Sequence, residues 1–412
     1  MNQTKALDSA DVVVVGAGIS GLATAYELRK KGYDVVVVEQ RFPAFGASGR
    51  HAGAIWLQLR RQGLELNLAR AGLAKYDEYI SEFGNTFRFR RNGGLFFFNT
   101  EEQGEVLSEY VQERKGAGLD IGLLNQKQAR KASAALPDDA IGAVYCADDA
   151  QVDPQLLVSA LASGCLRMGV RKYDNTAVLS TVRRGARLDA IRTVRGDIAT
   201  SAVVWATGAW AVNLQSEGME LPIETVRQGQ LVTQPLGITG SPIMHGPSGV
   251  GDCGALIELP GFKPELFASR RPASPGVRRS YEDTIALNDE GALYVGSTLD
   301  SYGSLNPHIG LSATTAMAEL LQERYPERSD LGVTGLWAGL GCSTVDGLPI
   351  VDRFEQNFVN CAHSWGFASA PIGGQITAEL LAGESNGFAA ALVANRMTLA
   401  EKSTDSDTVA TP

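Results

Sequence analysis

The stretch that decides the fold is DVVVVGAGISGLATAYELRKKGYDVVVVEQ, residues 11–40. Val12–Val15 is a continuous run of β-branched residues that ends abruptly at a glycine, which predicts a buried parallel strand. Ser20–Lys31 has the composition of a helix, Gly32 marks its end, and Val35–Val38 predicts a second buried strand. The stretch therefore predicts a β-α-β unit, whose crossover is right-handed almost by rule.

Three glycines, Gly16, Gly18 and Gly21, lie between the first strand and the helix. In this pattern the first glycine permits a tight turn, the second lets the backbone approach a pyrophosphate, and the third allows close helix–strand packing. The free N–H groups at a helix N-terminus attract phosphates. Glu39 ends the second strand, where an acid accepts hydrogen bonds from ribose hydroxyls. The combination predicts a dinucleotide site, and an acid rather than an arginine at position 39 argues against a 2′-phosphate.

Composition and charge exclude several classes of protein. A chain of 412 residues predicts two or three domains, and its 46 glycines exceed the usual share of roughly 7% without forming a collagen period. The formal net charge of −9 leaves no basic footprint for a nucleic acid. The nearest approach to a basic patch, Arg270, Arg271, Arg278 and Arg279, favours a solvated loop.

The five cysteines indicate a reducing compartment. Their number is odd and they form no CxxC pair, so neither a zinc ribbon nor a redox dithiol is predicted, and no metal site is expected. The first ten residues contain no apolar stretch, and the apolar runs are far shorter than the ~20 residues of a membrane span. We expect a cytoplasmic protein with free thiols and no membrane span.

Further along the chain, coarse patterns predict other elements. Residues 87–98 alternate and contain aromatics, which predicts a hairpin that turns at Asn92–Gly93. Residues 221–300 alternate between strand signals and Pro or Gly, as in an antiparallel sheet. Helices are predicted over Pro154–Met168, Leu311–Arg324 and Gly374–Leu381, and a disordered tail over residues 399–412.

Seven segments resemble, in order, the flavin amine oxidoreductases of the D-amino-acid oxidase, glycine oxidase and sarcosine oxidase superfamily. They are GAGISG with Glu39, ASGRHAG, AQVDPQLL, VVWATGAWA, VRQGQLV, WAGLGCSTVDGLPIVD and HSWGFASAPIGGQITAELLAG. The resemblance implies an α/β fold with a discontinuous Rossmann-like FAD-binding domain and an antiparallel-sheet (α+β) substrate domain. The FAD-binding domain is expected over 1–85, 141–220 and 331–398, and the substrate domain over 86–140 and 221–330.

The resemblance implies FAD contacts in each half of the chain. The expected residues are Gly16, Ala17, Gly18, Ile19, Ser20, Gly21, Glu39, Gln40, Ser48, Gly49, Arg50, His51, Ala52, Gly53, Val178, Thr207, Gly208, Trp210, Gly341, His363, Trp365, Gly366, Phe367 and Ala368. Some relatives attach FAD covalently through a histidine or a cysteine. His51 and Cys342 do not align with those residues, so noncovalent binding is expected.

The implied chemistry is removal of a hydride from a carbon beside an amine nitrogen, followed by hydrolysis of the imine. The cofactor carries the difficult step, so no side chain is assigned as a catalytic acid or base. Gly341 and Ala368 stand where relatives carry a carboxylate-binding arginine and a lysine. Either the substrate carboxylate is held elsewhere, with Arg50, Arg60 and Arg227 as candidate cations, or the substrate has a bulky apolar part. The substrate-site candidates are Trp56, Arg60, Arg227 and His245.

The resemblance leaves alternatives open. The chain could be the FAD subunit of a multi-subunit opine, hydroxyproline or D-amino-acid dehydrogenase that passes electrons to a partner instead of to oxygen. A flavin monooxygenase shares GAGISG and Glu39, but its late Gly-Asp motif is replaced here by WAGLGCSTVDG. The partners expected are a small amine or amino acid and an electron acceptor, and the oligomeric state stays open, a homo-oligomer included.

Overall fold

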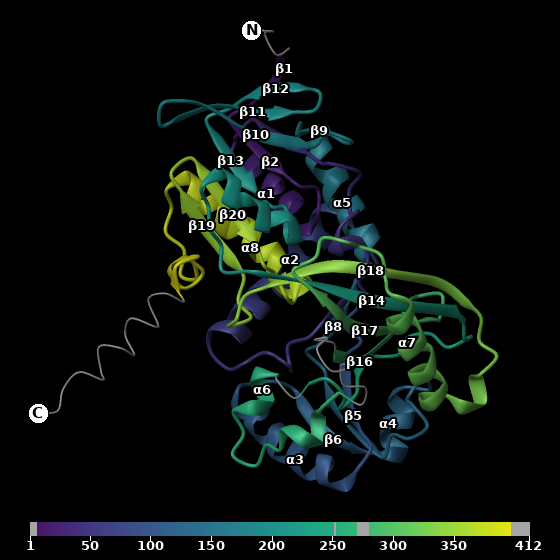
Figure 1. Cartoon of the computed structure of the whole chain (residues 1–412). Helices are drawn as coiled ribbons and strands as arrows, with labels where there is room; N and C mark the ends of the chain where they lie inside the picture. Colours follow the sequence, from purple (N-terminus) through teal and green to yellow (C-terminus); the bar gives the residue numbers. More distant parts are fainter. Residues whose placement is uncertain (1–5, 251–252, 270–279, 397–412) are drawn as a thin grey trace, which may run out of the picture. The chain divides into compact units, whose positions relative to one another are not determined.

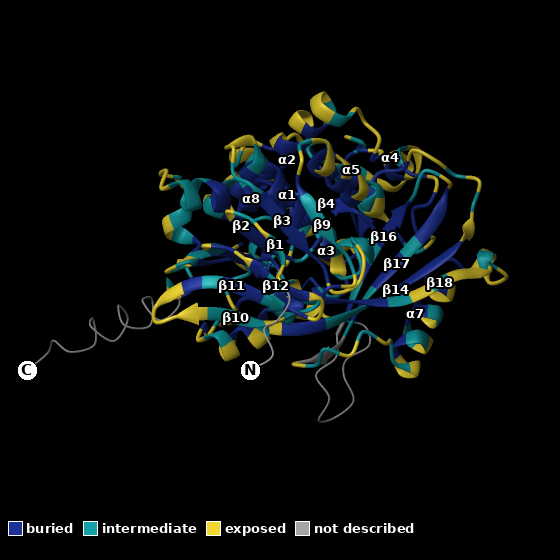
Figure 2. Cartoon of the chain, turned by 90° about the horizontal axis from the view of Figure 1, so that it is seen from above, coloured by how far each residue is buried: buried dark blue, intermediate teal, exposed yellow. Residues whose placement is uncertain are grey.

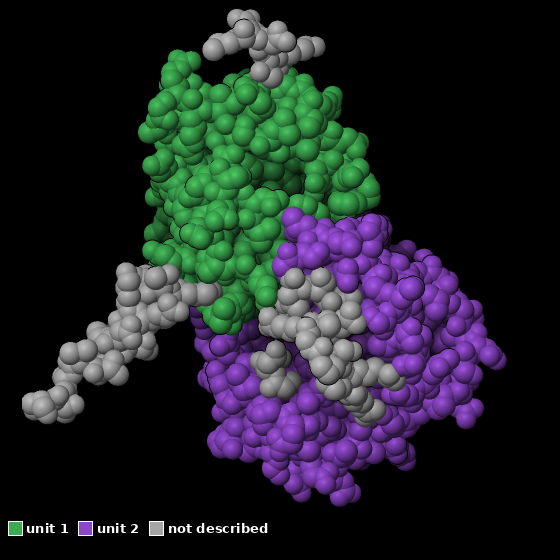
Figure 3. Space-filling view, viewed as in Figure 1, with its two compact units in different colours: residues 1–48, 158–225, 341–412 green, residues 49–157, 226–340 purple. Residues whose placement is uncertain are grey.

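The computed structural model describes residues 6–250, 253–269 and 280–396. The chain divides into two compact units (Figure 3): unit 1 comprises residues 1–48, 158–225 and 341–412, and unit 2 comprises 49–157 and 226–340. The expected tail at 399–412 and the four arginines of the sparse basic patch lie outside the described residues. Each unit is described by itself.

Unit 1 is built on a six-stranded sheet whose four central strands are buried. Its order is β19 (Ile350–Phe354), β20 (Asn357–Cys361), β13 (Ala202–Trp205), β2 (Val12–Val15), β3 (Val35–Val38) and β9 (Arg171–Tyr173). All neighbours are parallel except β19 and β20. The valines of β2 and β3 are almost fully buried (Figure 2), as strands covered on both faces must be.

The predicted β-α-β unit is confirmed. Helix α1 (Ile19–Lys30) connects β2 to β3, which pair in parallel with Val12 opposite Val35. Helix α8 (Gly366–Ala382) packs closely along α1. Gly374 permits this approach because it has no side chain, and a Cβ there would lie 2.7 Å from the Ala23 carbonyl carbon. Helix α8 begins at Gly366, earlier than the predicted start at Gly374.

The rest of unit 1 is a small sheet with two 3-10 segments. The four-stranded sheet has the order β1 (Ala6–Ser9), β12 (Gly196–Ala199), β11 (Arg187–Thr193) and β10 (Val178–Arg184). The 3-10 segments are η2 (Gly208–Glu217) and η5 (Ala389–Ala391). Helix α5 (Pro154–Arg167), which agrees with the predicted helix, and η1 (Ala47–Gly49) have residues in both units.

Unit 2 is built on an eight-stranded, mainly antiparallel sheet (Figure 1). Its order is β18 (Val333–Ser343), β14 (Glu224–Pro235), β17 (Ala292–Tyr302), β16 (Ser280–Leu287), β15 (Ile243–His245), β5 (Gly94–Phe98), β7 (Gly142–Cys146) and β6 (Ile121–Asn125). Strands β4 (Ala54–Ile55) and β8 (Ala150–Gln151) pair separately. The helical segments are α2 (Leu64–Phe83), α3 (Glu101–Gly116), α4 (Gln126–Ala132), α6 (Gly254–Ile257), η3 (Pro264–Phe267), α7 (Leu311–Arg324) and η4 (Pro326–Arg328). Helix α7 has the predicted bounds.

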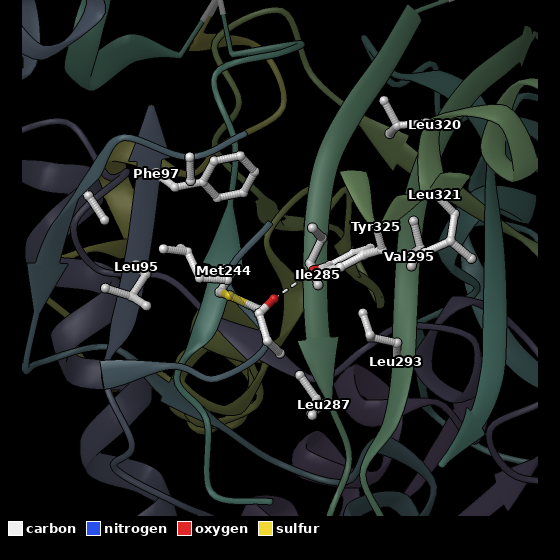
Figure 4. Packing of buried hydrophobic residues seen from close by; sticks show 14 of the residues in the cluster. Leu95, Phe97, Met244, Ile285, Leu287, Leu293, Val295, Leu320, Leu321 and Tyr325 are labelled. Atoms are coloured by element: carbon white, nitrogen blue, oxygen red, sulfur yellow. Dashed lines mark hydrogen bonds between the residues drawn. The ribbon is translucent and has the colours of Figure 1, made fainter. Parts of the chain in front are cut away.

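The period-2 alternation of strands gives this sheet two different faces. Leu95 and Met244, on neighbouring strands, point into an apolar core (Figure 4) that also contains Leu320 of α7. The next residues along β5 and β15, Phe96 and His245, are paired in register and therefore point to the opposite face.

The predicted hairpin over residues 87–98 is wrong. Only Gly94–Phe98 forms a strand, and β5 pairs with β7 on one side and β15 on the other. Arg90 instead makes a single bridge to Gln151. The alternation is real, but the strand finds its partners far along the chain, which a local turn signal cannot reveal.

The compact units do not coincide with the expected domain ranges. Residues 49–85 and 141–157 cluster with the eight-stranded sheet in unit 2, whereas the resemblance placed them in an FAD-binding domain. The assignment of these segments to cofactor binding thus stays a prediction. The α/β fold class, with one mainly parallel and one mainly antiparallel sheet, is confirmed.

Candidate functional site

The turn between β2 and α1 leaves no room for a side chain at its first and third glycines. Gly16 has φ +110°, and a Cβ on it would overlap the Ala206 carbonyl oxygen. A Cβ on Gly18 would lie 2.9 Å from the Ser48 hydroxyl, and one on Gly21 would overlap the Gly16 carbonyl oxygen. Backbone atoms therefore require glycine at Gly16 and Gly21, whereas the neighbour of Gly18 is a side-chain hydroxyl. The helix that follows has no acid in its first turn to compensate its positive end.

Glu39 lies beside this turn and is tied to it. Its carboxylate accepts a hydrogen bond from the Ala17 N–H at 2.9 Å and another from the Arg41 N–H at 2.9 Å. Burial raises the pKa of Glu39, and the two backbone donors act in the opposite direction. The Ser48 hydroxyl accepts from the Ile19 N–H at 3.1 Å and so caps the start of α1. The neighbouring candidate, Gln40, is exposed.

The segment after β13 brings a second group of candidates to the same turn. A Cβ on Gly16 would lie 3.7 Å from the Thr207 Cα. The Thr207 hydroxyl is buried and has no hydrogen-bond partner among the described residues. Gly208 has φ +55°, and the Trp210 ring lies 6.4 Å from that of Phe45. A buried hydroxyl without a partner is costly, so this atom fits a site that a polar ligand completes.

His363 is held in a hydrogen-bonded chain that links α8 to α1. The Thr24 hydroxyl donates to the Ser20 carbonyl oxygen, so it must accept from the Asn360 amide at 3.0 Å. The Asn360 oxygen then faces His363 Nε2 at 2.6 Å, which places the imidazole proton there, and the Ser369 hydroxyl faces Nδ1 at 2.8 Å. Burial lowers the pKa of His363 to about 3, so the ring is neutral.

The remaining unit 1 candidates lie apart from one another in the sequence. Val178 begins β10, and Gly341 lies on β18. Residues 366–368 form the first turn of α8, and the indole of Trp365, which precedes the helix, donates to the Gly347 carbonyl oxygen at 2.9 Å.

In unit 2, residues 50–53 form a tightly packed segment. The Gly53 N–H donates to His51 Nδ1 at 2.9 Å, so the neutral ring carries its proton on Nε2, and burial lowers the pKa of His51 to about 4. Arg50 donates to the Ala338 carbonyl oxygen at 3.1 Å, and the Trp337 indole donates to the Arg50 carbonyl oxygen at 3.1 Å. Gly49, His51 and Ala52 line a pocket of about 120 Å³ within unit 2.

Three of the four substrate candidates come together on one face of the unit 2 sheet. The Trp56 and His245 rings are 6.2 Å apart, edge to face. Burial lowers the pKa of His245, and the positive charge of Arg60 acts in the same direction, while Arg60 itself pairs with Glu65 at 3.1 Å. Arg227 lies on β14, which β16 and β17 separate from the strand of His245.

A family match accounts for the glycine turn with Glu39 in unit 1 and the aromatic face of the sheet in unit 2 occurring in one chain. The model of the FAD dependent oxidoreductases (DAO) matches residues 11–380. The chain belongs to this family. The predicted superfamily and FAD as the cofactor of the family are thereby confirmed.

Individual relatives are distant. Glycine oxidase of Geobacillus kaustophilus is 24% identical over 393 residues, covering 92% of this chain and 94% of that protein. Hydrogen cyanide synthase subunit HcnC of Pseudomonas aeruginosa is 23% identical and covers 90% and 91%. The mitochondrial pyruvate dehydrogenase phosphatase regulatory subunit of Mus musculus is 28% identical over 55% of this chain. The chain spans 26% to 52% of the length of the first three curated relatives it matches.

Solved structures share the fold over almost the full chain. Glycine oxidase from Geobacillus kaustophilus superposes with a TM-score of 0.78 at 22% identity, covering 95% of this chain and 99% of that one. L-proline dehydrogenase from P. horikoshii gives 0.77 at 21% identity with the same coverage. Among the described residues, no helix is long and apolar enough to cross a membrane, and no cluster of three or more His, Cys, Asp or Glu could hold a metal.

Sequence reasoning missed several polar residues that organise these sites. Asn360 and Thr24 support His363, and Asp149, in unit 2, holds the loop that carries Trp56. Asp149 follows Asp148 and immediately precedes the AQVDPQLL segment, and nothing in the local sequence distinguishes it from its neighbouring acids.

Proposed function

We propose that this protein oxidises the C–N bond of an amino acid or an N-substituted amino acid by hydride transfer to FAD, and that water then hydrolyses the imine. The observation that carries the proposal is the glycine turn beside Glu39 and the unpartnered Thr207 hydroxyl, in a chain that belongs to the FAD dependent oxidoreductases. The similarity to glycine oxidase over nearly the full length of both proteins supports an amine substrate.

Unit 1 supplies the groups that would hold the adenosine and pyrophosphate parts of FAD. The turn at residues 16–21 would face the pyrophosphate with bare backbone and the positive end of α1. Glu39 would accept from ribose hydroxyls, and Thr207 would gain the partner that it lacks. When bound, FAD supplies the two-electron acceptor of the reaction.

Two observations support noncovalent attachment. His51 Nδ1 is occupied by the Gly53 N–H, so it is not free to form a bond to the flavin. Burial raises the pKa of the Cys342 thiol to about 12, which leaves almost no thiolate to react. The other expected FAD contacts stay predictions.

Unit 2 supplies a surface suited to an apolar substrate group rather than a strong carboxylate anchor. Arg60 is already paired with Glu65, and Arg50 is bonded to the Ala338 carbonyl oxygen. Trp56 is half-buried and therefore offers part of its indole face. These features favour the bulkier, apolar substrate over glycine itself.

The similarity to a hydrogen cyanide synthase subunit supports a second candidate, the FAD subunit of a multi-subunit dehydrogenase. In that case the electrons leave to a protein partner instead of to oxygen. A cytoplasmic location and homo-oligomerisation remain proposals with either candidate.

An anaerobic screen of the FAD-loaded protein tests the function. D-amino acids, sarcosine-like amines, prolines and N-carboxymethyl amines are mixed with the enzyme, and flavin absorbance is followed. We expect at least one amine class to bleach the flavin. Peroxide on admission of air then indicates an oxidase, and bleaching without peroxide indicates the dehydrogenase subunit. Bleaching by NADPH and by no amine would overturn the proposal in favour of a monooxygenase.

A further inference from the structure

Asp149 is a carboxyl group enclosed in the interior of unit 2. Its exposed fraction is 0%. One oxygen accepts from the Leu57 N–H at 2.6 Å and the Gln58 N–H at 3.1 Å, and the other accepts from the Gln58 side-chain amide at 2.6 Å. Burial raises the pKa of Asp149 to about 7, while these donors act in the opposite direction. Burying a carboxyl group costs desolvation free energy, and an apolar side chain would stabilise the core at lower cost. A role beyond core stability is therefore expected for Asp149.

The three donors belong to the two residues that directly follow Trp56. Residues 57–60 form neither a helix nor a strand, so the sheet ladder does not fix them. The Tyr110 hydroxyl donates to the Gln58 carbonyl oxygen and holds the loop from a second side. Asp149 is therefore the main polar anchor of the loop that carries the Trp56 indole.

Gly94 shows how tightly this anchor is fitted against β5. A Cβ at this position would overlap the Asp149 carboxylate and would lie 2.6 Å from Cζ3 of Trp56. The carboxylate and the indole thus both press on the backbone of the same strand residue. The Gln58 amide, at 3.4 Å from the Gly94 carbonyl oxygen, lies over the same point.

On its other side the indole meets a rigid aromatic surface. His245 Nδ1 lies 2.7 Å from the Gly246 carbonyl oxygen and must donate to it, so the neutral ring is fixed in one tautomer. The Phe96 ring lies 6.0 Å from His245 and backs it. Trp56 retains part of its surface, whereas Phe96 is fully buried.

We propose that Asp149, seated in the space left by Gly94, is a positioning residue that holds Trp56 against His245 as a wall for the apolar side chain of the substrate. The proposal rests on the proposed function. Asp149 acts through the indole and does not touch the substrate, so its loss should change substrate preference more than turnover.

Two variants disturb the wall in different ways. Asp149→Ala removes both acceptor oxygens and with them all three hydrogen bonds, and Gly94→Ala places a methyl group where the carboxylate and the indole now lie. Asp149→Asn keeps an oxygen for the two backbone donors, and its NH2 group can donate to the Gln58 side-chain oxygen once the Gln58 amide turns over. Asp148→Asn, next in sequence, and Gly122→Ala, where a Cβ meets nothing within 4 Å, are the matched controls.

The measurement compares benzoate with acetate as probes of the FAD-loaded protein, read as a perturbation of the flavin spectrum. We expect the parent to bind benzoate more tightly than acetate. In Asp149→Ala and Gly94→Ala the benzoate Kd and the KM of an amine substrate with a large apolar side chain should rise about tenfold, the equivalent of one lost hydrogen bond to a charged group. The kcat, the acetate Kd and the KM of a small amine should stay within about twofold. Asp149→Asn and both controls should resemble the parent.

Several outcomes would overturn the proposal. Equal affinity of the parent for benzoate and acetate would show that Trp56 and His245 do not form an apolar wall for the ligand. Unchanged benzoate binding in flavin-loaded Gly94→Ala would also contradict the proposal. This variant provides the test if Asp149→Ala fails to fold. If Asp149→Asn behaves like Asp149→Ala, the charge rather than the positioning matters. Because the benzoate titration needs no turnover, it tests the wall even if no amine bleaches the flavin and the proposed function fails.

Discussion

At the residue scale, Gly16 has two separate reasons to be glycine. Its φ of +110° is unfavourable for any other residue, and a Cβ would overlap the Ala206 carbonyl oxygen. We predict that Gly16→Ala costs roughly 1–3 kcal/mol of unfolding free energy and abolishes FAD binding, because the turn must move away from the position that a pyrophosphate would occupy. Urea unfolding and quenching of FAD fluorescence measure the two effects.

Gly32→Ala is the matched control for this prediction. Gly32 also has a positive φ, +89°, but a Cβ there meets nothing within 4 Å. It should therefore lose stability through backbone strain alone and bind FAD like the parent. Retention of FAD by Gly16→Ala would show that the glycine turn does not approach the cofactor.

His363 should make stability depend on pH in a defined window. The pKa of the folded ring is about 3, whereas an unfolded histidine titrates near 6.5. Between these values the unfolded chain binds the extra proton, so the contribution is complete above about pH 6.5 and is lost as the pH falls towards 3. In His363→Gln the slope of unfolding free energy between pH 4 and 6 should decrease by up to about 1.4 kcal/mol per pH unit. Equal slopes in the two proteins would contradict this.

At the scale of elements, the contact between α1 and α8 depends on one missing side chain. A methyl group at Gly374 would lie 2.7 Å from the Thr24 nitrogen and the Ala23 carbonyl carbon, both in the backbone of α1. We predict that Gly374→Ala loses about 1–3 kcal/mol of unfolding free energy, although alanine normally favours a helix over glycine. Gly116→Ala, at the end of α3 with open space around it, should instead be neutral or gain up to about 1 kcal/mol. A stabilised Gly374→Ala would show that the helices can separate without cost.

The sequence predicts elements whose signals lie within the element or its neighbours. It does not predict how a strand pairs when its partner strands are remote in the chain. The β2–α1–β3 unit and α7 follow from valine runs, glycine breaks and helical composition, all read within about 30 residues. The local pattern around β5 predicts a hairpin, because nothing near it points to β7 and β15, which lie far along the chain. Alternation identifies a strand but not its neighbour.

The same limit applies to the candidate sites. The sequence indicates Trp56 and His245 independently of each other, and the structure places their rings 6.2 Å apart on one sheet face. Asp149 carries no periodicity or motif of its own, and only its buried contacts with residues 57 and 58 identify it. Residues that act by supporting others are therefore the ones that sequence reasoning misses.

At the scale of the whole molecule, FAD should stabilise the protein selectively. A ligand that binds only the folded chain adds RT ln(1 + [L]/Kd), about 2.7 kcal/mol at a hundred times its Kd. FMN lacks the adenosine ribose and the pyrophosphate, so it cannot use Glu39 or the glycine turn of unit 1 as proposed. We predict that FAD raises the melting temperature of the flavin-free protein clearly more than FMN does, and that Glu39→Gln reduces the FAD effect and leaves the FMN effect unchanged. Equal stabilisation by both flavins would mean that the flavin ring alone holds the cofactor, and the role proposed for the β2–α1 turn would have to be withdrawn.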